Sequence, residues 1–324
     1  MLNSIIYSFC VLFVIFSTSL ISCEGNDDGP SFDNVFEGDV ALSTQDEVNS
    51  FGMNNYDAIT GSLYIGGLGV NDIVDLTPLS SLTFIGSVLT IKLNSALVNL
   101  TGLNNLEYLG RTLIIQSNPS LLSIEGLASV SGSISILIIW ANHNLENLSG
   151  LQNITGVTQR LRIESNPMLQ SVDHLNSLTY VDYLRIINNP SIQYIGGFES
   201  LTTATNILIT KSPSLEYIEL ESLQTVEHIF RIDTNHLLTS IQGLSSLSDA
   251  RFINIIDNDT LESIDGLNGL TSIEYVNIHG NSMLRDYCAF ESLKLDDDYI
   301  DLISIHGNGY NPTDEDFFNG DCSQ

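Results

Sequence analysis

Large apolar residues recur along this chain at an interval much longer than the period of a helix or a strand. A six-residue pattern, LxIxxN or a close variant of it, appears nine times. Its last position falls at Asn94, Asn118, Asn142, Asn166, Asn189, Ser212, Asn235, Asn258 and Asn281. The intervals are 24 residues three times and then 23 residues five times. Self-similarity at roughly 20 to 50 residues is the signature of a solenoid, whose repeats each pack only on their neighbours.

The pattern predicts a short β-strand in every repeat. Because side chains alternate between the two faces of a strand, the L and I positions point inward and the second and fourth positions point outward. Further apolar residues follow at fixed offsets, as at Leu97, Leu100, Leu103 and Leu106, so one side of every repeat is buried. The remaining stretch, such as residues 106–112, is too short for a three-turn helix. We expect a second short strand there.

The asparagine of the pattern lies at a turn, because proline follows this position four times, at Pro119, Pro167, Pro190 and Pro213. An asparagine at a coil corner can bond through its amide to the backbone of the next coil. We therefore expect the column from Asn94 to Asn281 to form a buried ladder, with a ligand-binding polar column as the alternative. A glycine also recurs, at Gly102, Gly126, Gly150, Gly197, Gly243 and Gly266. A tight bend or a positive φ angle is expected there.

Taken together, LxIxxN, the following LxxLxGLxxL and the short return strand resemble the receptor L-domain type of leucine-rich solenoid, over roughly residues 39–310. The expected fold is an all-β dominated solenoid, a right-handed β-helix or leucine-rich-repeat-like array of about ten coils of 23–24 residues with parallel sheets. The resemblance implies binding of proteins or glycans through a sheet face or coil edge. It carries no shared catalytic motif and no shared ligand. It implies no signalling role, because the chain shows no kinase-linked or transmembrane segment.

The ends of the chain depart from the repeat and indicate five segments. We assign residues 1–22 to a lipoprotein signal peptide, 23–38 to an acidic flexible tether, 39–62 to an N-terminal capping segment, 63–287 to the repeat solenoid and 288–324 to a C-terminal cap with a last strand. Residues 1–22 carry no charged side chain and contain an apolar stretch of signal-peptide length. The acidic, unpatterned residues behind it are expected to be disordered.

The sequence Leu20–Ile21–Ser22–Cys23 resembles a bacterial lipobox, in which the thiol of Cys23 receives a diacylglycerol and becomes the first residue. The acidic stretch that follows resembles the signal that directs some lipoproteins to the outer face of the outer membrane. We therefore expect a surface-exposed outer-membrane lipoprotein, held to the membrane through its lipid anchor only. An ordinary signal peptide with a chance cysteine is the alternative.

The cysteine count is consistent with this processing. Removal of Cys10 and lipidation of Cys23 leave only Cys288 and Cys322 among the four cysteines. We expect these two to form a disulfide, which an oxidising compartment permits. Free thiols or a metal site are the alternatives.

The charge balance excludes some partners. The chain has 39 acidic and 10 basic residues, which give a formal net charge of −29. Such a surface repels phosphate backbones and anionic lipid headgroups. Nucleic acid is therefore not an expected partner.

The scarce basic residues gather on the outward strand positions. The second-position row holds Thr90, Ile114, Ile138, Arg162, Arg185, Leu208, Arg231, Asn254 and Asn277, and the fourth-position row holds Lys92, Gln116, Trp140, Glu164, Ile187, Thr210, Asp233, Ile256 and His279. With the fifth position, these 27 sites contain five of the ten basic residues, whereas random placement predicts about one. The sites contain three acidic residues, close to the random expectation.

The candidate binding residues on this face are Trp140, Arg162, Glu164, Arg185, Ile187 and Arg231. Tryptophan and arginine stack on sugar rings and dominate protein interfaces. The alternative is a solvated sheet, in which Arg162 pairs with Glu164 and Arg231 pairs with Asp233.

We expect no catalytic site, cofactor or metal. Glu164 and Asp233 are three coils apart, near 14 Å at about 4.8 Å per coil, whereas glycosidase carboxylates are roughly 5 to 9.5 Å apart. His279 and His306 share the motif IHGN and are expected to stack as an echo of the repeat rather than to bind zinc. The acidic loops show no calcium-binding spacing.

The leading hypothesis is a cell-surface lipoprotein, not an enzyme, that binds an extracellular glycan or protein through its outward sheet face; the ligand is expected to carry anionic groups. One alternative is a structural or adhesive spacer without a specific patch. A polysaccharide-active β-helix enzyme is the other.

Overall fold

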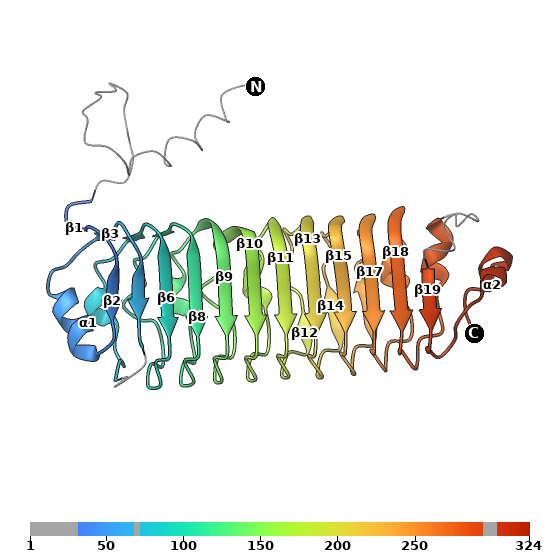
Figure 1. Cartoon of the computed structure of the whole chain (residues 1–324), viewed down its shortest axis with the longest axis horizontal. Coiled ribbons are helices and arrows are strands. Elements are labelled where there is room, and N and C mark those ends of the chain that lie inside the picture. The colour runs from blue at the N-terminus through green and yellow to red at the C-terminus, as the bar shows by residue number, and fades with distance from the viewer. Residues whose placement is uncertain (1–31, 68–71, 294–302) are drawn as a thin grey trace, which may run out of the picture. The chain divides into compact units, whose positions relative to one another are not determined.

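The computed structural model describes residues 32–67, 72–293 and 303–324. Its main feature is a sheet of twelve strands, in which each strand comes from one coil and pairs in parallel with its neighbours. In sheet order, the strands are β2 (Val40–Leu42), β4 (Leu63–Ile65), β6 (Val88–Lys92), β8 (Thr112–Gln116), β9 (Gly132–Trp140), β10 (Ile154–Glu164), β11 (Tyr180–Ile187), β13 (Thr203–Thr210), β15 (Thr225–Asp233), β17 (Asp249–Ile256), β18 (Ser272–His279) and β19 (Ile303–His306). Figure 1 shows these strands side by side. The predicted solenoid with parallel sheets is confirmed.

Neighbouring strands pair at equivalent positions of the repeat. Arg162 lies opposite Ile138 on one side and Arg185 on the other, and Glu164 lies opposite Trp140 and Ile187. The L and I positions of the pattern are buried from Leu89 to Ile278 and form the core. The second and fourth positions therefore form two continuous rows across the outside of the sheet, as the alternation predicts.

The return side of the coils contains shorter elements than the main sheet. Four short strands, β1 (Val35–Phe36), β3 (Ala58–Ile59), β5 (Phe84–Ile85) and β7 (Tyr108–Leu109), form one small sheet. Three others, β12 (Tyr194–Ile195), β14 (Tyr217–Glu219) and β16 (Ser240–Gly243), form a second one. The expected return strand over residues 106–112 is thus present at Tyr108–Leu109.

The sequence analysis did not foresee the 3₁₀ helices on this side. They are η1 (Thr77–Leu79), η2 (Glu125–Leu127), η3 (Asp173–Leu175), η4 (Asp265–Leu267) and η5 (Cys288–Leu293). A 3₁₀ turn has three residues per turn, so a single turn satisfies its own backbone groups without the length that an α-helix needs. This is how a coil of 23 or 24 residues reverses direction within a few residues.

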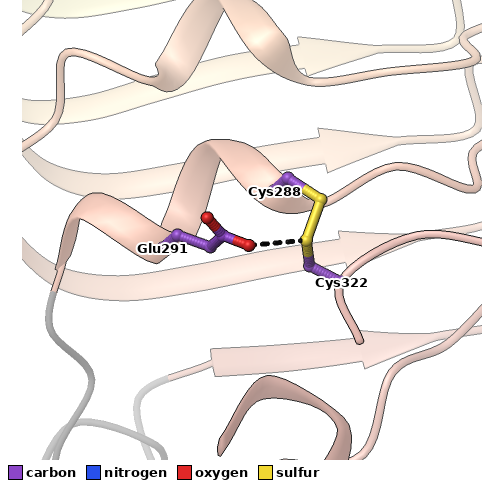
Figure 2. Close-up of side chains that lie close together, drawn as sticks. All are labelled: Cys288, Glu291 and Cys322. Atoms are coloured by element: carbon purple, nitrogen blue, oxygen red, sulfur yellow. Dashed lines mark hydrogen bonds between the residues drawn. A yellow bond between two sulfur atoms is a disulfide. The ribbon is translucent and has the colours of Figure 1, made fainter. Parts of the chain in front are cut away.

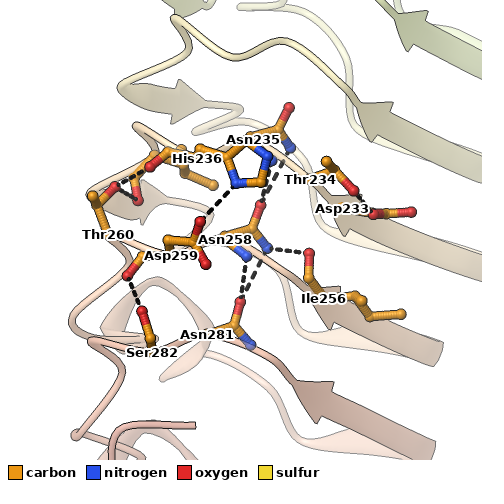
Figure 3. A network of polar contacts seen from close by, with 11 residues as sticks. Asp233, Thr234, Asn235, His236, Ile256, Asn258, Asp259, Thr260, Asn281 and Ser282 are labelled. Carbon is orange, nitrogen blue, oxygen red and sulfur yellow. Dashed lines mark hydrogen bonds and ion pairs between the residues drawn. The ribbon is translucent and has the colours of Figure 1, made fainter. Parts of the chain in front are cut away.

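The predicted asparagine ladder is confirmed. The side chains from Asn94 to Asn281 are fully buried. In a typical step, the Oδ1 atom of Asn142 accepts hydrogen bonds from the backbone N–H and Nδ2 of Asn118, at 3.2 and 3.1 Å. The Nδ2 atom of Asn118 also donates to the carbonyl of Ile91, at 3.0 Å. Figure 3 shows the steps through Asn235, Asn258 and Asn281, and the ladder continues to Asn308.

The residue before each ladder asparagine has an unusual backbone conformation. Its φ angle lies between 51° and 62° at Leu93, Ser117, Ala141, Ser165, Asn188, Lys211, Thr234 and Asp257. Non-glycine residues seldom adopt this left-handed region. The turned backbone lets each of these N–H groups donate to the next coil, as from Ala141 to the Glu164 carbonyl at 3.0 Å. This interaction between coils compensates for the local strain.

The recurring glycines are explained mainly by close approach between coils. A Cβ atom on Gly126 would lie 2.1 Å from the Leu100 carbonyl oxygen, and one on Gly266 would lie 1.8 Å from the Ile241 oxygen. Positive φ angles occur at Gly102, Gly150 and Gly197, so the expected bend explains only part of the series. The shared cause is that each of these glycines lies directly against the backbone of the preceding coil.

At the N-terminus, the solenoid starts earlier than the segment boundaries predicted. Strand β1 pairs with β3, and β2 pairs with β4, so residues 35–42 already belong to coils. The assignments of residues 23–38 to a tether and 39–62 to a cap need this correction, because the short strands of this first coil lack the full repeat pattern. The helix α1 (Gln45–Gly52) caps this end, with Val48 buried and a capping box between Thr44 and Glu47. Residues 1–22 and Cys23 lie outside the described residues.

At the C-terminus, the structure contains the expected disulfide between Cys288 and Cys322, shown in Figure 2. The disulfide joins η5 to the last residues of the chain, which follow α2 (Asp314–Asn319). Ser323 forms an antiparallel bridge with Asp286, and the N–H of Tyr287 donates to the Cys322 carbonyl at 2.9 Å. The final segment therefore covers backbone groups that the last coil would otherwise expose.

Candidate functional site

The candidate site lies on the outer face of the main sheet, on β9, β10 and β11. Arg162 of β10 is held between two side chains. Its Cζ atom lies 4.4 Å from the centre of the Trp140 ring on β9, and its Nε donates to the Oε2 of Glu164 at 2.6 Å. The side chains of Arg162 and Glu164 are 23% and 19% exposed, so the pair is partly shielded from water. A cation–π contact and a charge-assisted hydrogen bond together restrict the guanidinium to one orientation.

The same contacts change the pKa of the Glu164 carboxyl group. The hydrogen bond from Arg162 lowers the pKa of Glu164, and the positive charges of Arg162 and Arg185 lower it further, while partial burial opposes them. Glu164 is therefore ionised at neutral pH. It neutralises part of the positive charge around it.

Arg185 of β11 lies directly opposite Arg162 in the strand register. Its Cζ atom lies 5.8 Å from the ring centre of Tyr183, and its Nε is buried without a hydrogen-bond partner among the described residues. None of the ion pairs within the described ranges involves Arg185. Two like charges directly opposite each other on neighbouring strands are destabilising.

Arg160 adds a third positive charge that the sequence analysis missed. It lies on β10 two residues before Arg162, opposite Ile136, and its side chain is exposed. Over the described parts of the chain, no hydrogen bond or ion pair involves the Arg160 side chain. Arg160 and Tyr183 each directly precede the first, inward position of the LxIxxN pattern. The alternation of side chains along the strand therefore predicts that both point outward. We call Arg160, Arg162, Arg185 and Glu164 the arginine patch.

The remaining predicted residues divide between the patch and another part of the sheet. Ile187 is half-buried and lies opposite Glu164, so it borders the patch. Arg231 lies on β15, two strands beyond β11, and is not part of the patch. Its Nε and Nη2 donate to the Oδ2 of Asp233 at 3.0 and 2.5 Å. Both ion pairs of the solvated-sheet alternative are thus present, but they leave Arg160 and Arg185 without an acid.

Trp140 is half-buried rather than openly exposed, because Arg162 covers one face of its ring. The tryptophan therefore orients the arginine, and the stacking surface expected for a sugar ring is partly occupied. This is a correction that only the side-chain geometry could supply.

The histidines and cysteines considered as metal ligands lie in the C-terminal part of the solenoid. The ring of His279 on β18 and the ring of His306 on β19 stack on each other, with centres 4.9 Å apart and planes inclined by 5°. Within the described residues, one group of three side chains of the kinds that bind metals lies close together. It consists of Cys288, Glu291 and Cys322. The two sulfur atoms of that cluster are joined in a disulfide, and a Glu291 oxygen lies 3.0 Å from the Cys322 sulfur (Figure 2).

No helix of the described ranges has the length and apolar character needed to cross a membrane. The sequence matches no protein-family model and no curated protein. Among solved structures, a similar chain is an internalin from Listeria monocytogenes strain 4b F2365. The similarity covers 76% of this chain and 67% of the internalin chain, at 20% identity and a TM-score of 0.34. The fold assignment therefore rests on the strand pairing described above, and the receptor L-domain resemblance stays a prediction.

Proposed function

We propose that this chain is a non-catalytic recognition protein that binds an extracellular glycan or protein through the arginine patch. The observation that supports this proposal is a local excess of positive charge. Three arginines share one carboxylate, in a chain whose formal net charge is −29. Two of these arginines lie directly opposite each other. An anionic group of a ligand placed between them offsets a repulsion that Glu164 compensates only in part.

The patch is also partly preorganised. Trp140 and Glu164 hold Arg162 in place from two sides, so binding costs less side-chain entropy than it does for a free arginine. Arginine and tryptophan are the residues that most often dominate binding energy at protein interfaces.

The positions of the outward carboxylates support a binding role rather than a hydrolytic one. Glu164 and Asp233 are each engaged by an arginine of their own strand. They lie three strands apart, a separation of about 14 Å at the usual strand spacing. Paired carboxylates that cleave glycosides are closer than about 9.5 Å.

The test is a comparison of binding by the soluble chain that starts after Cys23, measured against an array of glycans and surface proteins. We expect Trp140→Ala combined with Arg162→Ala and Arg185→Ala to abolish binding of a ligand found in this way. The control is Arg251→Ala, which removes one positive charge outside the patch, from an exposed arginine paired with Glu274. Unchanged binding by the triple variant would contradict the proposed site, and a circular-dichroism melt verifies that the variants are folded.

We also propose that Cys23 anchors the chain to the outer membrane, as the lipobox-like sequence predicts. Cys23→Ser should then move the protein from the membrane fraction to the soluble fraction. Mass spectrometry of the mature N-terminus should find a diacylglycerol on the unsubstituted chain. A protein that stays membrane-bound after this substitution would oppose the anchor.

The second candidate is a structural spacer, which the two internal ion pairs of the sheet face favour. Deletion of residues 236–281 joins Asn235 to Ser282 and removes two coils in phase, at a distance from the arginine patch. A spacer loses function when it is shortened. A patch binder keeps its ligand affinity.

A further inference from the structure

The arginine patch lies within a longer band of basic side chains on the same face. The band follows seven consecutive strands of the sheet, from β6 to β15. Three outward rows cross these strands: the residue before the pattern, called the leading row, and the second- and fourth-position rows. They contain the basic residues Lys92, Arg160, Arg162, Arg185 and Arg231 and only the acidic residues Glu164 and Asp233. In the whole chain, acidic residues outnumber basic ones by 39 to 10, so the ratio is reversed in these three rows.

Both acids of the band are occupied by arginines of their own strands. Lys92 at one end lies 5.1 Å from the centre of the Tyr64 ring, and within the described residues it has no ion pair. The cations of Lys92, Arg160 and Arg185 are therefore available to a ligand. They lie on strands that are spread along the sheet rather than gathered at one point.

The spacing of this band suits a polymer. Parallel strands repeat at about 4.8 Å, which is close to the length that one sugar residue adds to an extended polysaccharide. A chain that runs across the strands thus places about one sugar on each strand. Six strand intervals separate β6 from β15, so the band is about 29 Å long, far longer than a single small anion requires.

The distribution of charge favours a polysaccharide over a protein partner. Protein interfaces gather apolar residues in one compact centre with a polar rim, although arginine is common in them. In this band the central second-position row holds Arg162, Arg185 and Arg231, with Leu208 between the last two. Ile114 and Ile138 lie in the same row on the two strands before Arg162, between it and the strand of Lys92. Short aliphatic side chains between cations can contact the apolar faces of sugar rings, while the cations bind the acidic substituents.

We propose that the ligand of this face is a linear acidic polysaccharide that lies across the strands from β6 to β15. This inference rests on the proposed function and names the ligand class. The strongest anion subsite is between Arg162 and Arg185, where a carboxylate or sulfate group bridges two guanidinium groups. Arg160 contributes a third positive charge next to this subsite.

The experiment measures binding of the soluble chain to oligosaccharides of defined length by calorimetry. The probes are oligogalacturonates, which carry carboxylates, heparin fragments, which carry sulfates, and dextran fragments, which are neutral. We expect one acidic series to bind, with an affinity that rises with length and levels off near seven sugars, the number of strands in the band. Binding should weaken at high salt, because ions screen exposed charges. The series that binds distinguishes a uronate ligand from a sulfated one.

Substitutions assign the binding to the patch. Arg185→Gln and Arg160→Gln should each weaken binding by about tenfold, the loss of one charge-assisted contact. Arg185→Lys should retain a part of the affinity, because it keeps the charge without the planar fork. The matched control is Arg251→Gln, an exposed arginine whose Nε is paired with Glu274 at 2.6 Å; it should bind as the unsubstituted chain does. Arg185→Gln keeps most of the side-chain volume and removes the repulsion with Arg162, so its melting temperature should not fall below that of the unsubstituted chain.

The outcomes separate this inference from the proposed function. If acidic oligosaccharides of every length fail while an array protein binds and loses affinity in Arg185→Gln, the ligand class is wrong and the patch is right. An affinity that does not depend on the length of the oligosaccharide indicates a site for a single anion and overturns the proposal of a polymeric ligand. If no array or oligosaccharide ligand responds to Arg185→Gln or Arg160→Gln, both proposals are wrong.

Discussion

Ser212 occupies a ladder position that holds asparagine in the neighbouring coils. Its Oγ is buried, with no hydrogen-bond partner within the described residues. Asn189 still accepts from Asn166, and Asn235 accepts from the Ser212 N–H, but within the described residues Asn189 makes no ladder bond to Ser212. The shorter side chain does not reach the preceding coil, so one step of the ladder is missing.

Ser212→Asn should stabilise the solenoid, because the longer amide side chain supplies the missing acceptor for Asn189. A typical net contribution of a hydrogen bond is about 1 kcal/mol, so thermal denaturation should show a higher melting temperature. Ser212→Ala is the control, and it should change little, since the present hydroxyl makes no bond within the described residues. A lower melting temperature for the asparagine variant would mean that the step is closed by other groups.

The ionisation of Glu164 in the arginine patch contributes to the stability of the folded chain. Its pKa in the folded chain lies below its ordinary value of 4.5. The ionised carboxylate therefore contributes stability above pH 4.5, and this contribution is lost as the pH falls through the lowered pKa.

Glu164→Gln should consequently lower the melting temperature at pH 7, and the difference from the unsubstituted chain should shrink as the pH is taken below 4.5. Glu146→Gln makes the same change of charge at an exposed position and serves as the control. A difference that stays constant between pH 7 and pH 3 would argue against the ion pair with Arg162 as the cause.

At the scale of a coil, the strand and its turn are governed by distances to the neighbouring coil. The glycines illustrate this point, because Gly126 has a negative φ angle and yet permits no side chain. The Leu100 carbonyl occupies the space that a Cβ atom would need.

Gly126→Ala should therefore destabilise the solenoid by about 1 to 3 kcal/mol, the usual cost of overpacking. Gly67→Ala is the control, since among the described residues the nearest atom to a Cβ there is the Ser43 Oγ, at 3.4 Å, an ordinary contact. Chemical denaturation of both variants measures the difference. Equal stability of the two would contradict the steric explanation.

At the scale of the whole solenoid, stability is close to a sum of terms between neighbouring coils. The disulfide closes a separation of 34 residues at the C-terminal end only. Its effect should remain local, because each coil contacts only the coils next to it.

Replacing both Cys288 and Cys322 with alanine should remove about 3 to 4 kcal/mol by the chain-entropy model of such a loop. Hydrogen exchange should accelerate in β18 and β19, while β6 and β8 keep their protection. Uniform loss of protection along all strands would show that the solenoid unfolds as one cooperative unit.

Much of the fold could be predicted because one local pattern is repeated. The in-phase asparagines identified the strand, the turn and the buried ladder, and the alternation of side chains identified the outward rows. The predicted pairing of Cys288 with Cys322 is also confirmed. The 3₁₀ helices, the positive φ angles and the start of the first coil at β1 were missed, because they depend on closing the coil and its ends rather than on the periodic positions.

The candidate site was predicted in part. The sequence alone placed Trp140, Arg162 and Arg185 on one face, since strand alternation and a fixed repeat determine which side chains share a row. Only the tertiary structure decided how they interact: Arg162 is covered by Trp140 and bound to Glu164, whereas Arg185 has no acid among the described residues. Periodicity determines the row that a side chain occupies. The rotamers and charges of the adjacent coils determine which partner it has, and these exist only once the coils are stacked.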